Sequence, residues 1–544
     1  MKRKFFFASL MLMGASLVAN AQGYKDGIEY YKVDKLDNAK ELLERNLNAA
    51  STDKAEAYYY LGQIALHQGK VAEAAANFEK GIAANAMNPY NYVGQAAIAL
   101  KNGGGEAKAL LDKARKLTKK DPKLEMEIAR AFYDANPTTY AKDIEKCIKN
   151  ARKWNADDPN SYIFEADTKA DKKDWGNAAG IYELAFDKDP NNIEAYVKYA
   201  NTYFNVNPEM AIERLEELQA KVPNSALVQR ELAEKYYADN LGAKAAEQYG
   251  KYIKNPNHFA QDEVRYVQLL FFGEKYQDSY NLATSLVNKL NPADEKVFYM
   301  KRMQLYNLVQ LQKWPEAVEA GKSFFANALP KGSNYEVRDY TDYGQALQEA
   351  NLPEQAIAAY EKALELNPKN TDLMRFMGDS YADTENFVKA AEYYQRLVDM
   401  GKDFYKSNDF FTLSNYYLGV ASAEGLDDAV RADALNKSQK YVDEVDKMVP
   451  GNVQIVNQKA KIAKVREGEN NNGAALDAYN ELLNILDAKP DKSGYERYYK
   501  YAYNYLATYY FTKGDKATAK TYYQKWLEYD PENESLRNYV NSLK

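Results

Sequence analysis

The 544-residue chain is poor in the side chains that build most catalytic and metal sites, since it has one cysteine, Cys147, and two histidines, His67 and His258. A single cysteine excludes an internal disulfide, and its place among apolar residues at helical spacing predicts a buried packing side chain. Two distant histidines argue against zinc sites and against Ser-His-Asp or Cys-His catalysis. We therefore expect no catalytic residues, no metal site and no cofactor, and a protein that is not an enzyme.

Long apolar runs are also missing after the first 21 residues. The early apolar stretch, residues 5–18, follows the basic residues 2–4 and precedes Ala-Asn-Ala at 19–21. A basic start, a short apolar stretch and a small-x-small ending are typical of a secretory signal, and the stretch is shorter than the roughly 20 residues that span a bilayer. We expect residues 1–21 to be a signal peptide, cleaved after Ala21, and no transmembrane segment in the mature chain.

No cysteine follows this signal directly, so the thiol that anchors a bacterial lipoprotein to lipid is missing. The style of the signal resembles that of exported Bacteroidota proteins. These features predict a soluble exported protein that is periplasmic or associated with the outer membrane. The net charge of −6 makes the chain a poor ligand for polyanions, so we expect no nucleic-acid partner.

A repeated phrase is the strongest positive feature of the sequence. It recurs at a spacing of 34 residues from Gly344, Ala356 and Tyr360 to Gly378, Ala390 and Tyr394, with Pro368 closing the first copy. A fixed period of this length is typical of stacked helical hairpins. Small residues allow the two helices of a hairpin to approach closely, tyrosine fills the wider gap, and proline ends the second helix. No sustained alternation of apolar and polar residues predicts a strand.

The last copy is the fullest, with Leu506, Ala507, Tyr510, Gly514, Ala519, Tyr523, Trp526 and Pro531. This pattern resembles the tetratricopeptide repeat (TPR). The resemblance implies an all-α fold, a right-handed superhelical solenoid of about 14 antiparallel helical hairpins. The strict period favours an open superhelix over a closed toroid.

The domain organisation follows the repeats. We predict an N-terminal array at 22–335 and a C-terminal array at 336–544, with a stretched repeat at 400–450. A longer connection at 329–339 and a polar loop at 466–473 also interrupt the rhythm. Such interruptions either carry partner contacts or are tolerated insertions.

The resemblance implies a concave groove, lined by the first helices of successive hairpins, that holds an extended partner segment. The residues that map to groove positions are Tyr59, Tyr60, Gln63, Lys198, Asn201, Arg230, Arg375, Asp379, Tyr501, Asn504 and Tyr505. The excess of tyrosine, 48 residues, supplies rings with polar tips that suit a binding surface. Some TPR proteins grip a terminal carboxylate, and Lys198, Asn201 and Arg230 offer part of such a clamp.

The sequence thus predicts a non-enzymatic scaffold or adaptor in the bacterial cell envelope that binds a protein or peptide segment. A glycan-binding protein similar to the helical SusD-like lipoproteins is an alternative that the tyrosines favour and the missing lipid-anchoring cysteine opposes. A third candidate is an α/α-toroid enzyme acting on carbohydrates, although no pair of carboxylates is singled out by the sequence.

Overall fold

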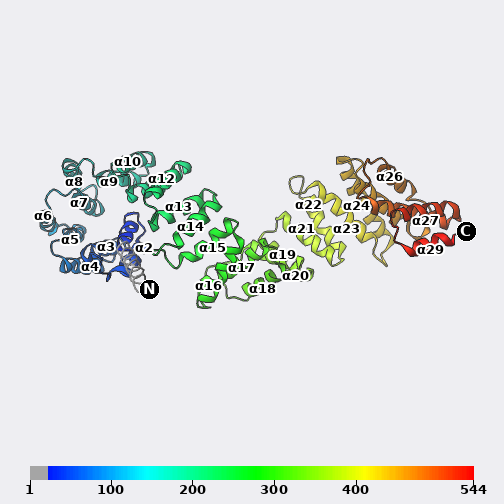
Figure 1. The fold of residues 1–544 in the computed structure, drawn as a ribbon, viewed down its shortest axis with the longest axis horizontal. Coiled ribbons are helices and arrows are strands. Elements are labelled where there is room, and N and C mark those ends of the chain that lie inside the picture. Colours follow the sequence, from blue (N-terminus) through cyan, green and yellow to red (C-terminus); the bar gives the residue numbers. More distant parts are fainter. Residues whose placement is uncertain (1–22, 544) are drawn as a thin grey trace, which may run out of the picture. The chain divides into compact units, whose positions relative to one another are not determined.

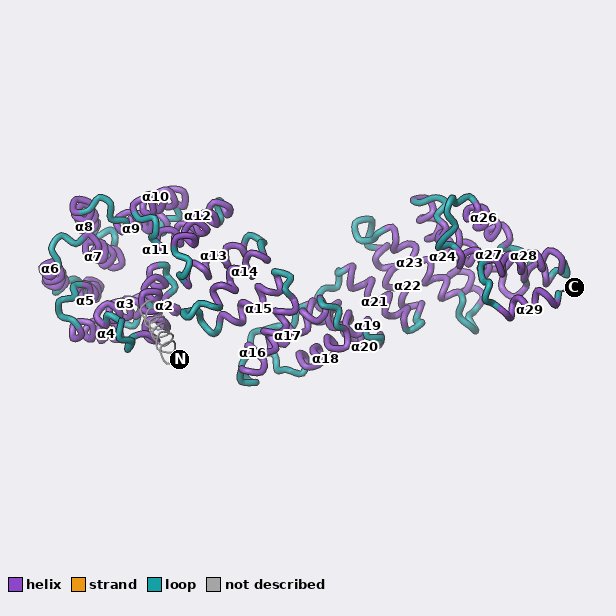
Figure 2. The backbone as a smooth tube through the Cα atoms, in the orientation of Figure 1, coloured by secondary structure: helices purple, strands orange, loops and turns teal. Residues whose placement is uncertain are grey.

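The computed structural model describes residues 23–543, and these fold entirely into helices, turns and loops without a strand (Figure 2). Antiparallel helices follow one another along the chain and pack as hairpins. The predicted fold class, an all-α solenoid of helical hairpins, is therefore confirmed. The predicted signal peptide at 1–21 lies outside the described residues.

The chain divides into two compact units, and the first one ends at Pro292. It starts with a helix at residues 23–32. The helices that follow are α2 (Leu36–Asn46), α3 (Lys54–His67), α4 (Val71–Ala84), α5 (Tyr90–Lys101), α6 (Ala107–Leu117), α7 (Pro122–Ala135), α8 (Ala141–Trp154), α9 (Asn160–Ala170), α10 (Trp175–Lys188), α11 (Ile193–Tyr203), α12 (Pro208–Lys221), α13 (Ala226–Ala238), α14 (Gly242–Ile253), α15 (Asp262–Phe272) and α16 (Tyr276–Lys289).

The second unit begins at Ala293, so the predicted division between residues 335 and 336 falls inside it, between two of its helices. Its elements are α17 (Glu295–Gln310), α18 (Trp314–Phe325), α19 (Val337–Glu349), α20 (Pro353–Leu366), α21 (Thr371–Asp383), α22 (Phe387–Asp399), α23 (Ser407–Ala421), α24 (Asp428–Met448), α25 (Val453–Glu467), the 3₁₀ turn η1 (Gly468–Asn470), α26 (Leu476–Asp487), α27 (Glu496–Thr512), α28 (Lys516–Glu528) and α29 (Glu534–Ser542).

The interruptions of the repeat have clear structural counterparts. Residues 326–336 form the long connection between α18 and α19. The stretched repeat owes its length to α24, which has 21 residues, and the polar loop near residue 470 begins with the short turn η1.

Each hairpin of the regular type is held together by an aromatic ring seated on a small residue. A Cβ atom built on Gly344 of α19 would lie 2.4 Å from the ring of Tyr360 in α20, and one on Gly378 of α21 would lie 2.6 Å from the ring of Tyr394 in α22. Such distances are too short for a real side chain. The sequence positions that define the repeat are therefore set by the closest approach of the two helices.

The first unit closes on itself, contrary to the expectation of an open array. The ring of Tyr30 packs edge-on against Phe259 at 5.4 Å between centroids. Lys35 forms an ion pair with Glu231 at 2.8 Å. In Figure 1 the segment from α13 to α15 accordingly comes back beside the N-terminal helices, whereas α16, the last helix of the unit, leads away from them. The strict period of residues 344–394 lies in the second unit, so it carries no information about contacts within the first unit.

Replacing Gly378 with alanine should destabilise its hairpin. The new methyl group must displace the Tyr394 ring, and overpacking of this kind costs about 1–3 kcal/mol, more than the gain of up to about 1 kcal/mol from removing a helical glycine. Because repeats contact mainly their neighbours, hydrogen exchange should rise first in α21 and α22.

The matched control is Gly180→Ala in α10, where an added Cβ would meet nothing within 4 Å. This exposed helical site should become slightly more stable. Equal effects of the two substitutions on thermal unfolding would contradict the packing role of Gly378.

Candidate binding cavity

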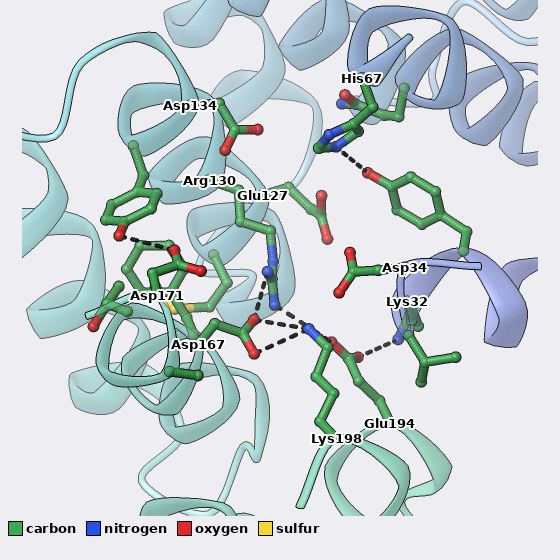
Figure 3. Close-up of a pocket in the computed structure, with 18 of the residues that line it drawn as sticks. Lys32, Asp34, His67, Glu127, Arg130, Asp134, Asp167, Asp171, Glu194 and Lys198 are labelled. Atoms are coloured by element: carbon green, nitrogen blue, oxygen red, sulfur yellow. Dashed lines mark hydrogen bonds and ion pairs between the residues drawn. The ribbon is translucent and has the colours of Figure 1, made fainter. Parts of the chain in front are cut away.

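A cavity of about 540 Å³ lies on the inner side of the first unit (Figure 3). Its walls come mainly from α3, α5, α7, α9 and α11, which are the first helices of successive hairpins, together with the turn that follows residues 23–32. Cavities of about 300–1,000 Å³ are typical of sites for small molecules or for a few residues of a peptide. The return of the N-terminal turn therefore adds one more wall to this concave surface, and the resulting cavity remains partly open to solvent.

A carboxylate on α9 gathers two cations on one wall of the cavity. Asp167 accepts hydrogen bonds from Lys198 of α11 at 2.9 Å, from Arg130 of α7 at 2.9 Å and from the hydroxyl of Tyr182 at 2.6 Å. Burial would raise the pKa of the Asp167 carboxyl, but the charges of Lys198 and Arg130 outweigh it and hold the pKa below its ordinary value. Asp167 is thus ionised and fixed in place.

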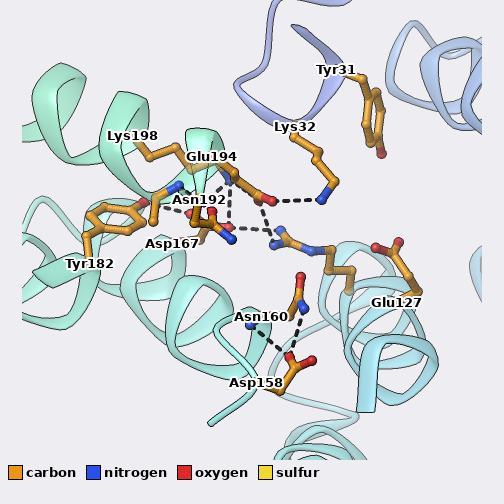
Figure 4. A network of polar contacts seen from close by, with 12 residues as sticks. Tyr31, Lys32, Glu127, Asp158, Asn160, Asp167, Tyr182, Asn192, Glu194 and Lys198 are labelled. Atoms are coloured by element: carbon orange, nitrogen blue, oxygen red, sulfur yellow. Dashed lines mark hydrogen bonds and ion pairs between the residues drawn. The ribbon is translucent and has the colours of Figure 1, made fainter. Parts of the chain in front are cut away.

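A second carboxylate extends this network to the N-terminal hairpin, which consists of the helix at residues 23–32 and α2 (Figure 4). Glu194 pairs with Lys198 at 3.4 Å, with Arg130 at 3.4 Å and with Lys32 at 3.3 Å. Lys32 lies at the end of the first helix, so this ion pair also ties the N-terminal hairpin to α11. The cations again outweigh burial and lower the pKa of Glu194.

Three further carboxylates face the cavity and take no part in that network. Within residues 23–543, no ion pair is formed by Asp34, Glu127 or Asp134. Figure 3 shows these side chains turned toward the space between His67 and Arg130. Burial raises the pKa of both Asp34 and Asp134 above the ordinary value.

Glu127 differs because it has a hydrogen-bond donor, the hydroxyl of Tyr59, at 2.7 Å. Gln63 also lines the cavity. Its residue is only 8 % exposed, and in the described part of the chain its side-chain amide makes no hydrogen bond. Its amide atoms are not among the fully buried polar atoms without a partner, so they face the cavity and are free to bond to a ligand or water.

The seam is the region where residues 23–46 meet residues 225–261, and it contains the buried carboxyl of Asp26 and the half-buried carboxyl of Glu29. Asp26, which is 1 % exposed, accepts a hydrogen bond from Asn257 at 2.7 Å, and Glu29 accepts one from Ser225 at 3.3 Å. Burial raises the pKa of Asp26 to about 7. Burial and the neighbouring Asp26 raise the pKa of Glu29 to about 8.

Two cations act weakly on these seam carboxyls. Arg45 lowers the pKa of Asp26, and Lys32 lowers that of Glu29, but in each case burial prevails. Near neutral pH the carboxyls of Asp26 and Glu29 are consequently protonated in a substantial fraction of the molecules.

The predicted groove residues of the first unit divide into cavity-lining and buried side chains. Gln63, Lys198 and Asn201 line the cavity. Tyr59 is 1 % exposed and Tyr60 is also buried, so their rings pack in the core and offer no free aromatic surface.

Arg230 and Arg375 connect neighbouring repeats. Arg230 of α13 pairs with Asp262 of α15 at 2.8 Å, and Arg375 of α21 pairs with Asp409 of α23 at 2.8 Å. Arg230 is held by Asp262 and Lys198 by two carboxylates, so both cations of the predicted carboxylate clamp already have acidic partners within the chain.

The remaining candidates lie in the second unit. Asp379 accepts hydrogen bonds from Tyr394 at 2.8 Å and Tyr416 at 2.6 Å, and Tyr505 is buried with its hydroxyl donating to Glu467. By contrast, the ring of Tyr501 is 48 % exposed, and Asn504 is half-buried in the same helix. Tyr501 is thus the exposed member of the C-terminal candidates, while Arg375 and Asp379 are half-buried like Asn504 but already hold protein partners.

Sequence reasoning did not single out Asp34, Glu127, Arg130, Asp134, Asp167 or Glu194. The spacing of these charges could have predicted the network. Asp167 follows Arg130 by 37 residues and precedes Lys198 by 31, and each spacing is close to one repeat period. Opposite charges spaced by one period on first helices meet across neighbouring hairpins.

Other chemistry-bearing groups are accounted for by packing. The thiol of Cys147 is buried, as predicted, and burial raises its pKa to about 12. Among residues 23–543 no cluster of three or more His, Cys, Asp or Glu side chains is arranged to hold a metal ion. None of the described helices combines the length and apolarity that crossing a membrane requires.

Comparison with known proteins places tetratricopeptide repeats in both units. Models of the tetratricopeptide repeat match residues 24–89, 342–403 and 501–533. The match at 24–89 begins at the first described helix and covers the hairpin that closes the cavity. The chain therefore contains TPRs, as its spacing predicted.

Tetratricopeptide repeat protein 21B is similar over a short segment. The mouse protein is 38% identical over 65 residues, or 12% of this chain, and the human protein is 36% identical over 76 residues, or 14%. These segments span 5% and 6% of those proteins. Among solved structures, the C-terminal part of a TPR repeat-containing protein from Cytophaga hutchinsonii covers 51% of this chain and 98% of its own, with 18% identity and a TM-score of 0.39.

The docking of the N-terminal hairpin should weaken as the pH rises from 6 to 9. Unfolded Asp and Glu titrate near pH 4, so the folded seam keeps protons that the undocked hairpin has lost. The docking free energy then falls by up to about 1.4 kcal/mol per pH unit for each carboxyl, until the pH passes the folded pKa. Hydrogen exchange of residues 23–46, corrected for the intrinsic rate, should be slower at pH 6 than at pH 9.

Glu29→Gln replaces one titrating group with a neutral amide, and should make this protection higher at pH 9 and less dependent on pH. Glu44→Gln, at an exposed site on α2, should leave the wild-type dependence intact. Protection of residues 23–46 that does not change with pH in the wild-type protein would refute the role of the seam carboxyls.

Proposed function

We propose that this protein is a non-enzymatic interaction scaffold or adaptor of the bacterial cell envelope, and that its first unit holds a segment of a partner protein in the inner cavity. The observation that carries the proposal is the cavity of about 540 Å³ lined by the first helices of successive TPR hairpins. The matched repeats support a protein or peptide as the partner.

The arrangement of the walls favours binding over a purely structural role. Arg130, Asp167, Glu194 and Lys198 fix one another through ion pairs, so the polar side chains are held in place before any partner arrives. Preorganised groups lose little conformational freedom on binding and therefore gain affinity.

Export to the envelope is supported by the sequence alone. Residues 1–21 combine the basic start, the apolar stretch and the small residues before a cleavage site. Cell fractionation and N-terminal sequencing of the purified protein test this part. A mature N-terminus at Gln22 in the periplasmic or outer-membrane fraction is expected, and an intact Met1 in the cytoplasmic fraction would refute export.

Site-specific photocrosslinking in the native cell tests the inner cavity as the binding surface. A photoreactive amino acid at Asn201, whose exposed side chain lines the cavity, should crosslink to a discrete protein partner. The same probe at Lys146, exposed on α8 and not part of the cavity, should not. Crosslinking confined to Lys146, or equal patterns from both positions, would contradict the proposal.

A further inference from the structure

The charges of the inner cavity do not balance. Six carboxylates line it, from Asp34, Glu127, Asp134, Asp167, Asp171 and Glu194, against four lysine and arginine side chains, from Lys32, Lys101, Arg130 and Lys198. An enclosed space with an excess of one sign of charge attracts ligands of the opposite sign. The cavity thus carries a net negative charge.

The excess negative charge comes from carboxylates that form no ion pair in the part of the chain that the structure describes. Lys32, Arg130 and Lys198 are drawn into ion pairs with Asp167 and Glu194 on the wall formed by α7, α9 and α11. Three of the carboxylates outside these ion pairs, called the acidic side below, are Asp34 of the N-terminal turn, and Glu127 and Asp134, which lie about one helical turn on either side of Arg130 on α7 (Figure 3). In residues 23–543 these three carboxylates have no cation within ion-pair distance.

The three carboxylates are also accessible. Asp34 and Asp134 are exposed to solvent in the cavity, and Glu127 is partly exposed, so a ligand can reach all three. Burial nevertheless raises the pKa of Asp34 and Asp134, because protein surrounds each side chain beyond its immediate solvent. A cation placed between them would relieve this cost.

A second, independent feature marks the same space as a ligand site. Gln63 lines the cavity and is 8 % exposed as a residue, and its amide, which reaches the cavity, has no hydrogen-bond partner in the described chain. Its carbonyl can accept a hydrogen bond from a ligand N–H. The ring of Tyr31, which also lines the cavity, offers an aromatic surface for a guanidinium or ammonium group.

We propose that the acidic side of the cavity, formed by Asp34, Glu127 and Asp134 with the amide of Gln63, binds a positively charged side chain, arginine or lysine, of the partner segment. This inference rests on the proposed function, because it names the chemistry by which the cavity recognises that segment. Carboxylates accept charge-assisted hydrogen bonds from a guanidinium or ammonium group, and these are stronger than bonds between neutral groups.

Titration calorimetry of the purified full chain with the tripeptide acetyl-Gly-Arg-Gly-amide tests the inference. The same tripeptide with citrulline in place of arginine keeps the shape and removes the charge. Since a hydrogen bond to a charged group contributes about 1.5–3 kcal/mol, we expect the citrulline peptide to bind at least about tenfold more weakly. Raising the salt from 0.02 to 0.3 M should also weaken binding of the arginine peptide, because screening reduces charge attraction.

Asp34→Asn and Asp134→Asn should each weaken the arginine peptide severalfold, and the double variant by about tenfold or more. Both variants should fold, because neither side chain forms an ion pair and asparagine tolerates the backbone φ of +64° at position 34. Glu145→Gln, an equal change of charge at an exposed site on α8 outside the cavity, should leave affinity unchanged.

The inference is overturned if the two tripeptides bind equally, if neither binds, or if the Asp34 and Asp134 variants match the Glu145 control. Binding of spermidine without the arginine tripeptide would assign the site to a free polyamine and would also overturn it. Photocrosslinking at Asn201 does not depend on charge. A partner captured there without selectivity for arginine refutes this inference alone, whereas charge-selective peptide binding without a captured protein refutes the proposed function.

Discussion

The contact between an aromatic ring and a glycine sets the distance between the two helices of a hairpin. The spacing of neighbouring hairpins depends on that distance. Tyr360 over Gly344 and Tyr394 over Gly378 are two copies of this contact in the second unit. In the first unit the ring of Phe78 serves two glycines, Gly62 and Gly94, whose added Cβ atoms would each lie 2.3 Å from it. Because one ring fixes three helices, the angle between successive hairpins is determined as well as their spacing.

Regular spacing alone would leave an open concave surface, and the seam at the N-terminal hairpin changes that outcome. Asp26 and Glu29 meet residues near α13 and α15 through hydrogen bonds, while Lys32 reaches Glu194 on α11. These contacts bring polar groups from separate hairpins around one space. The cavity is therefore a product of closure, and its acidic side includes Asp34 because the same hairpin supplies it.

The sequence was sufficient for the parts of the structure that repeat and insufficient for those that occur once. Gly344, Tyr360 and their equivalents predicted the hairpins because the same packing problem recurs every 34 residues. The seam could not be read in this way, since Asp26 and Asn257 lie 231 residues apart and belong to no period. The helical positions of Tyr59 and Arg230 were inferred correctly as first-helix positions, yet their side chains turn to a buried core and to Asp262, which depends on local neighbours rather than on the repeat.

The return of the first hairpin to residues 225–261 also has a consequence for the order in which the chain acquires its structure. Most hairpins of a repeat array pack against neighbours made moments earlier, so their contacts are local and form quickly. Residues 23–46 must instead wait until the chain has been made and folded through Phe259 and Gln261, more than 200 positions later. Until then the cavity lacks Asp34 and its neighbours, so a segment that is synthesised early is among the last to reach its final packing.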